Sequence, residues 1–324
     1  MVASGARLAV GSRFEPSIFW DEVRRYGATC VSYTWAMMDE IAQGPPNPGE
    51  SHHPVRLFMG SGMPRGLWKR VTERFAPARV LEFYASTEGD AVLVNVTGRK
   101  AGCKGRPLPG SAEVRVAAYD PIDRGLILAD NGYAIESAPT DPGMLLARVR
   151  PEAIGMGDGV LRGVFEPGDA WLETGDLFVV DEDGDFWLVD HISTVIRSAS
   201  GIVWSGPIQD ALGDVDSIAL AVAYGVRRED ETEVPCAAMT LHEGHKLDVH
   251  EVERALADLG DAGIPAVIRV VDRIPLTTWY RPITGPLEQE GLPMPSTPPD
   301  SWYWDPRKGG YRRMSKAGRE RLLA

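Results

Sequence analysis

The stretch from Leu81 to Gly89, LEFYASTEG, carries the side chains whose chemistry is easiest to interpret. An apolar run ends in an aromatic residue and then in small, hydroxyl and acidic residues, which is typical of a strand followed by a polar loop. Ligands of α/β sheets bind at the carboxyl ends of the strands. There the ring of Tyr84 can stack on a base, the hydroxyl of Thr87 can donate to a phosphate oxygen, and the carboxylate of Glu88 can hold Mg²⁺. Taken alone, the stretch favours an ordinary polar turn at the end of a strand.

Two other stretches offer matching chemistry. Gly60 and Gly62 follow an apolar run in FMGSGMPRG, where glycine lets a backbone approach a flat ligand closely. Asp176 lies in WLETGDL, inside a predicted β-hairpin, where a carboxylate can accept both hydroxyls of a ribose. A surface aspartate is the alternative for that position.

Composition excludes some classes of partner and compartment. A net charge of -12 argues against binding to a nucleic-acid backbone, which needs a basic face. Three widely spaced cysteines fit a reducing compartment without a disulfide framework. The longest apolar run, over 218–226, is too short to span a bilayer. We therefore expect a cytoplasmic protein of two or three domains, because the chain has 324 residues.

Strands and helices alternate in the first part of the chain, which predicts a partial parallel α/β sheet over residues 1–89. The expected strands cover residues 8–10, 29–33, 55–59 and 80–84. The expected helices cover residues 16–26, 35–42 and 64–75.

The composition then changes twice. Residues 90–189 are rich in glycine, proline and short apolar runs, which predicts a small antiparallel β-barrel. Its last hairpin carries Asp181, Asp183 and Asp185, and a hairpin tip is favoured over a calcium loop because the glycine is misplaced and the distal glutamate is missing. Residues 190–324 predict a small α+β domain, with a helix capped by Asp248 and a tail whose structure the pattern does not determine.

The order and spacing of these stretches resemble the adenylate-forming superfamily of acyl-CoA synthetases. The closest resemblance is to the fatty-acid transport protein and very-long-chain acyl-CoA synthetase branch. It is carried by FEPSIFWDEVRRYGATCVSY, VRLFMGSGM, LEFYASTEG, WLETGDL and PLEQEGLP. It implies the C-terminal part of an adenylate-forming enzyme. In that family the carboxylate of a long-chain fatty acid attacks the α-phosphate of ATP with Mg²⁺ and releases pyrophosphate, and the thiol of coenzyme A then attacks the acyl-adenylate and releases AMP.

The resemblance also implies a role for each matching residue. Thr87 would bond the phosphate, Glu88 would ligate magnesium, and Asp176 would bind the ribose diol. The residues that would contact the adenine are Gly60, Ser61, Gly62 and Tyr84.

Three further positions take their roles from the last domain of the family. Asp190 would lie at the hinge about which that domain rotates, and Gly201 would line the approach of the thiol. Arg281 stands where the family has a lysine that meets the carboxylate and phosphate, and arginine is a planar fork rather than a compact ammonium. His191 replaces the arginine that normally follows the hinge aspartate.

One departure from the family leaves three interpretations open. The sequence begins after the position of the family's Ser/Thr/Gly-rich loop, which ends in lysine and cradles the β- and γ-phosphates. The first interpretation is an AMP-forming fatty-acid–CoA ligase. The second is a truncated or degenerate non-catalytic relative that binds nucleotide weakly or needs a partner chain with the missing half. The third is a full enzyme whose missing half is encoded upstream. Peripheral membrane association stays open, because the branch often lies at membranes.

Overall fold

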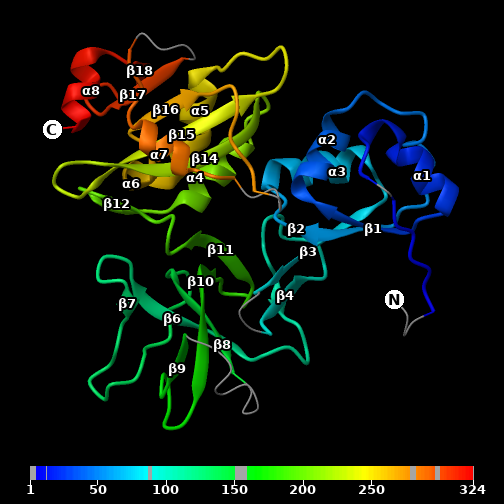
Figure 1. Ribbon diagram of the computed structural model, residues 1–324, viewed down its shortest axis with the longest axis horizontal. Helices are drawn as coiled ribbons and strands as arrows, with labels where there is room; N and C mark the ends of the chain where they lie inside the picture. The colour runs from blue at the N-terminus through cyan, green and yellow to red at the C-terminus, as the bar shows by residue number, and fades with distance from the viewer. Residues whose placement is uncertain are drawn as a thin grey trace.

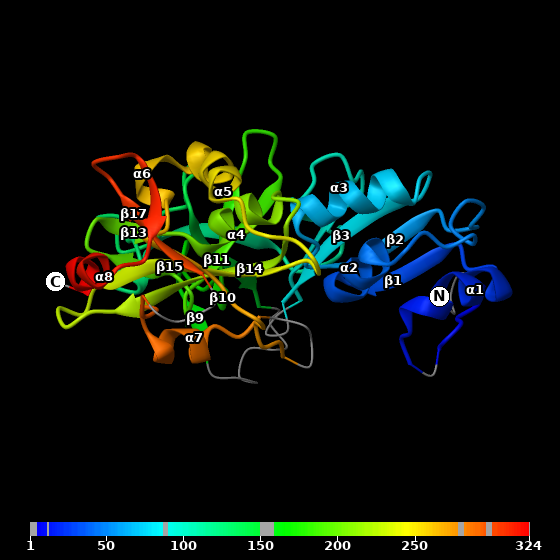
Figure 2. The same ribbon diagram turned by 90° about the horizontal axis from the view of Figure 1, so that it is seen from above.

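The computed structural model describes residues 5–11, 13–86, 90–149, 159–277, 282–295 and 300–323. These residues form three units, each built on its own sheet (Figure 1). The first unit is blue to cyan, the second is mostly green, and the third runs from green through yellow to red. The two ends of the chain lie at opposite sides of the molecule in both views (Figures 1 and 2).

The first unit is a five-stranded sheet in the order β1-β2-β3-β4-β5. Strands β1 to β3 are parallel, and β4 and β5 are antiparallel additions, so the predicted partial parallel sheet is confirmed and continues past residue 89. The elements are η2 (Pro16–Ile18), α1 (Phe19–Tyr26), β1 (Cys30–Thr34), α2 (Trp35–Gln43), β2 (Leu57–Ser61), α3 (Arg65–Arg74), β3 (Arg79–Ala85), β4 (Val92–Asn95) and β5 (Arg106–Pro107).

The helices of this unit bury their apolar stripes in one core with the sheet. Trp20 of α1, Met38 of α2 and Val71 of α3 are all buried there, beside Phe58 of β2. Figure 2 shows α3 along one face of the sheet. Gly27 ends α1 in the left-handed conformation, as a helix stop should.

One predicted strand of this unit is wrong. Residues 8–10 form no strand, and the side chains of Leu8 and Val10 are exposed. The short apolar run has the composition of a strand, but a strand needs hydrogen bonds to a neighbour, and in the described residues β1 pairs with β2 alone.

The second unit is an antiparallel sheet in the order β11-β10-β8-β6-β7, with β9 beside β10. The predicted antiparallel unit is confirmed, although its end strands β11 and β7 do not pair in the described part of the chain, so the sheet stays open. The strands are β6 (Val114–Asp120), β7 (Gly125–Leu126), β8 (Gly143–Arg148), β9 (Val160–Arg162), β10 (Ala170–Val180) and β11 (Phe186–His191).

The third unit is the predicted small α+β domain, with a seven-stranded sheet in the order β13-β12-β15-β16-β17-β18 and β14 beside β15. Asp248 caps α5 as predicted, because its side chain accepts the backbone N–H of His250 at 2.9 Å. The elements are β12 (Ile196–Ser198), β13 (Gly201–Val203), α4 (Ser205–Gly213), β14 (Ile218–Arg227), β15 (Glu233–Leu241), α5 (Val249–Leu256), η4 (Ala257–Leu259), α6 (Gly260–Gly263), β16 (Val267–Val270), α7 (Gly285–Glu290), β17 (Ser301–Asp305), β18 (Gly310–Arg313) and α8 (Lys316–Leu323).

The first and third units touch through α3 and α4. A Cβ built on Gly66 of α3 would lie 2.2 Å from the carbonyl oxygen of Gly213 at the end of α4. The backbones of the two helices therefore approach more closely than any side chain at position 66 would allow. Within the described ranges, no helix combines the length and apolar character that a membrane crossing requires.

Candidate functional site

A pocket of about 560 Å³ is lined by all three units. The first unit contributes α2, the loop that follows β2, and the segment before β5. The second contributes the bulged part of β10 and the end of β11, and the third contributes α4 and β14. The lining includes Gly62, which can offer backbone groups, and the charged residues Lys104, Asp176, Asp190 and Asp210.

A β-bulge positions Asp176 at this pocket. The register of β10 against β8 shifts between Glu173 and Leu177, where two strands otherwise pair regularly. Gly175 has a φ of 76°, and a Cβ there would lie 2.7 Å from Nε2 of His191. Thr174 fixes the bulge, because its hydroxyl donates to the Leu145 carbonyl at 2.9 Å and accepts the Asp176 N–H at 3.2 Å.

The side chains of Tyr84 and Asp176 meet directly. The Tyr84 hydroxyl donates to Oδ2 of Asp176 at 2.6 Å, which joins β3 of the first unit to β10 of the second. The tyrosine ring is buried and lies edge-on to Phe178, with ring centroids 5.1 Å apart. Burial, with the nearby Asp176 carboxylate, raises the pKa of Tyr84 above its ordinary value, so the hydroxyl stays a donor.

The structure explains why position 60 must be a glycine, which the sequence alone did not reveal. Tyr33, Gly60 and Glu82 lie side by side in the register of three parallel strands. The Tyr33 ring crosses Gly60 to donate its hydroxyl to Oε2 of Glu82 at 2.7 Å. A Cβ on Gly60 would lie 2.4 Å from the Tyr33 carbonyl oxygen and 2.7 Å from its ring, so no larger residue fits.

Glu82 is a fully buried carboxylate (0% exposed) that holds the loop after β2. Its Oε1 accepts the backbone N–H groups of Gly62 and Met63 and the ammonium of Lys104, the last at 2.8 Å. Burial and this carboxylate raise the pKa of Tyr33. Glu82 therefore fixes the part of the glycine loop that lines the pocket.

Asp190 is a buried junction between β11 and α4. Its carboxylate accepts the N–H of Ser205 at 2.6 Å and the Ser205 hydroxyl at 2.8 Å. It also accepts the Thr194 hydroxyl at 2.5 Å and the His191 N–H at 2.8 Å. Asp190 therefore ties the last strand of the second unit to the first helix of the third.

Asp210 places a carboxyl group of α4 in the lining of the pocket. Burial raises its pKa above the ordinary value, while the cations of Lys104 and Arg65 oppose the rise. Lys104 is thus bonded to Glu82 of the first unit and also interacts electrostatically with Asp210 of the third.

The structure brings together only part of the predicted site. Gly62, Asp176 and Asp190 line the pocket. The other predicted residues that the structure describes are outside its lining: Gly60, Ser61, Tyr84 and Gly201. Tyr84 still reaches the pocket through its bond to Asp176, whereas Gly201 opens β13 in an exposed turn with a φ of 123°. Thr87, Glu88 and Arg281 lie outside the described residues.

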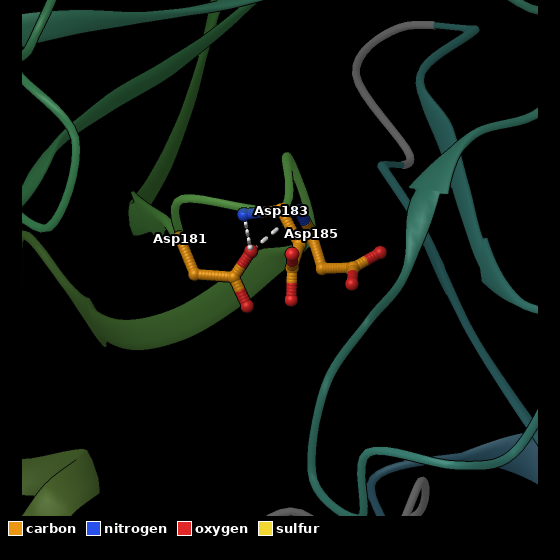
Figure 3. A group of neighbouring side chains, drawn as sticks. All are labelled: Asp181, Asp183 and Asp185. Carbon is orange, nitrogen blue, oxygen red and sulfur yellow. Dashed lines mark hydrogen bonds between the residues drawn. The ribbon is translucent and has the colours of Figure 1, made fainter.

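The aspartate triad at the β10–β11 turn is the hairpin tip predicted for it. Figure 3 shows the three carboxylates, with Asp181 accepting the backbone N–H groups of Asp183 and Asp185. Their oxygens lie close enough to hold a metal ion, but the ammonium of Lys100 bonds all three at 2.7 to 2.8 Å. A lysine therefore supplies the positive charge that a cation would bring.

Sequence reasoning missed Glu82 and Lys104. One signal for Glu82 was available, since a carboxylate alternates with Val80 and Tyr84 on the buried face of β3 and needs a partner there. Lys104 lies 22 residues further along the chain, and nothing in GCKGRP indicates a buried ion pair.

With this geometry established, comparison with known proteins defines the class. The family model for AMP-binding enzymes matches residues 1–124, and the model for the AMP-binding enzyme C-terminal domain matches residues 208–278. Together they cover more than half of the chain, in the order expected. The chain belongs to the AMP-binding, adenylate-forming enzyme family.

The curated relatives point to one branch of that family. The chain is 30% identical over 303 residues to long-chain fatty acid transport protein 5 of Mus musculus, covering 89% of this chain and 44% of the relative. It is also 30% identical over 294 residues to the medium/long-chain-fatty-acid–CoA ligase FadD6 of Mycobacterium tuberculosis, covering 87% and 48%. The chain thus spans about half the length of the curated relatives it matches.

Solved structures share the fold. The amide bond synthetase McbA from Marinactinospora thermotolerans superimposes with a TM-score of 0.68 at 22% identity, over 86% of this chain and 56% of that one. ATP-bound MatB from Rhodopseudomonas palustris gives a TM-score of 0.66 at 20% identity, over 86% and 53%. The predicted fold class, the C-terminal part of an adenylate-forming enzyme, is confirmed.

Proposed function

We propose that this chain forms the adenylate-binding part of an AMP-forming fatty-acid–CoA ligase. The observation that carries the proposal is the convergence of Gly62 from the first unit and of Asp176 and Asp190 from the second on one pocket that the third unit also lines, with Tyr84 bonded to Asp176. A backbone wall next to a carboxylate suits a nucleoside, because the carboxylate can accept both ribose hydroxyls.

The substrate class rests on the relatives. Those most similar in sequence are named for long-chain fatty acid transport and for medium- and long-chain fatty-acid–CoA ligation, so a long-chain fatty acid, ATP and coenzyme A are the proposed substrates. Thr87 and Glu88 are proposed to meet the phosphate and Mg²⁺, and Arg281 the reacting carboxylate. Gly60 and Ser61 are proposed to border the adenine, Tyr84 to stack on it, and Gly201 to line the thiol path.

Exchange of labelled pyrophosphate into ATP tests this proposal. Purified protein with a long-chain fatty acid and Mg²⁺ is expected to catalyse exchange that depends on the acid, because adenylate formation is reversible. Omission of the acid is the control. No exchange at high protein concentration would contradict the ligase proposal. Binding of AMP without exchange would instead support a nucleotide-binding relative that needs a partner chain.

A further inference from the structure

We propose that Lys104 and Glu82 are positioning residues: their buried ion pair fixes the Gly62–Met63 backbone as the pocket wall against which a nucleoside binds. The inference rests on the proposed function, since it concerns the same pocket. It adds two residues to which neither the sequence motifs nor the family resemblance gave a role.

The carboxylate of Glu82 has partners on both oxygens. Oε1 accepts from Lys104 at 2.8 Å and from the backbone N–H groups of Gly62 and Met63, the latter at 3.3 Å, while Oε2 accepts from Tyr33 at 2.7 Å. Hydrogen bonds to a charged acceptor are stronger than those between neutral groups. A single buried charge thus holds two consecutive backbone amides of the loop.

Lys104 is what allows that charge to be buried. A carboxylate without a compensating cation is costly away from water. The lysine side chain is 11% exposed, and its backbone is held on both sides. Its N–H donates to the Phe186 carbonyl of β11 at 2.9 Å. A Cβ on the next residue, Gly105, would lie 2.1 Å from the Val94 carbonyl of β4. This lysine is therefore fixed in place, unlike a solvated surface lysine.

The pair acts on a ligand through the loop. Glu82 is fully buried and lines no part of the pocket, whereas Gly62 and Met63, which it holds, do. Lys104 itself lines the pocket, but its ammonium is bonded to Oε1 of Glu82. We therefore expect loss of the pair to act through the freed loop amides. The affinities for adenosine and for AMP should then fall by the same factor. A lost phosphate contact would instead weaken the binding of AMP alone.

The test is calorimetric binding of AMP and of adenosine to the full chain. Lys104→Met is expected to weaken both ligands by the same factor, about tenfold, and Lys104→Arg to recover most of the loss because it keeps the charge. If Lys104→Met does not fold, the double variant Glu82→Gln/Lys104→Met replaces it, because it leaves no unpaired buried charge. The same loss of affinity for both ligands is expected.

Lys100→Met is the matched control. Lys100 also bonds carboxylates, those of Asp181, Asp183 and Asp185, but it does not line the pocket. It is expected to leave both affinities unchanged. Wild-type affinity in Lys104→Met, loss of AMP binding alone in that variant, or an equal loss in Lys100→Met would each overturn the inference. Binding of neither ligand by the wild-type protein would overturn the nucleotide site as well.

Discussion

The bond between Tyr84 and Asp176 joins two residues that the sequence assigned separately, one to a base and one to a ribose. Its length of 2.6 Å and the buried ring show a fixed contact between the first and second units. Asp176 thereby has a defined orientation before any ligand arrives. Preorganisation of this kind lowers the entropy lost on binding.

Removing the hydroxyl should measure this contact. Tyr84→Phe is expected to lower the free energy of unfolding by about 1–2 kcal/mol, because a hydrogen bond to a carboxylate is lost in a largely buried place. Urea denaturation followed by tryptophan fluorescence measures it. Tyr26→Phe, at an exposed tyrosine, is the control and should change little. Equal stability of the Tyr84→Phe and wild-type proteins would contradict the role given to this bond.

At the same scale, the sequence could predict a pocket residue where the signal lies in a short motif. Asp176 and Gly62 stand in short motifs, and both line the pocket. Glu82 was not predictable, because its partners Lys104 and Tyr33 are 22 and 49 residues away and meet it only once the sheet has formed. The packing role of Gly60 was missed for the same reason, since the ring that needs its space comes from another strand.

Elements were predictable where a periodic apolar face has a partner to cover it. The helices and strands of residues 16–85 follow their predicted order, with boundaries shifted by a few residues. The run at 8–10 has strand composition but no neighbouring strand in the described residues, and it forms no strand. Elements α7, β17, β18 and α8 were missed, because they are short and the stretch that holds them has no clear apolar period.

The contact between α3 and α4 gives a prediction at this scale. Gly66→Ala is expected to lower the free energy of unfolding by about 1–3 kcal/mol, because its Cβ would lie 2.2 Å from a backbone oxygen that cannot move alone. Chemical denaturation of Gly66→Ala and of the control Gly213→Ala is the measurement.

Gly213→Ala is the matched control on the opposite helix. Its Cβ would lie 3.8 Å from Cβ of Pro64, an ordinary contact. Alanine also favours helix, so stability should stay unchanged or rise by up to about 1 kcal/mol. If the two variants were equally stable, the close approach of α3 and α4 would not exist in solution.

The whole molecule is built on three sheets (Figure 1), and residues of all three units line one pocket. Asp190 lies where the second unit passes into the third, and the bonds from Ser205 and Thr194 fix the direction in which the third unit leaves. The family resemblance predicted these units from composition and motif order. It could not predict the ion pairs and helix contacts that set how the units meet, because those depend on residues from different units.

Calorimetric titration of the wild-type chain with AMP tests the central claim most directly, in parallel with Asp176→Asn and Asp258→Asn. We expect one AMP per chain and an affinity about tenfold weaker in Asp176→Asn, which loses the charged acceptor for the ribose hydroxyls. Asp258→Asn should match the wild type, because Asp258 is exposed and outside the pocket. Absence of AMP binding, or equal binding by the wild type and Asp176→Asn, would contradict a nucleotide site in this pocket.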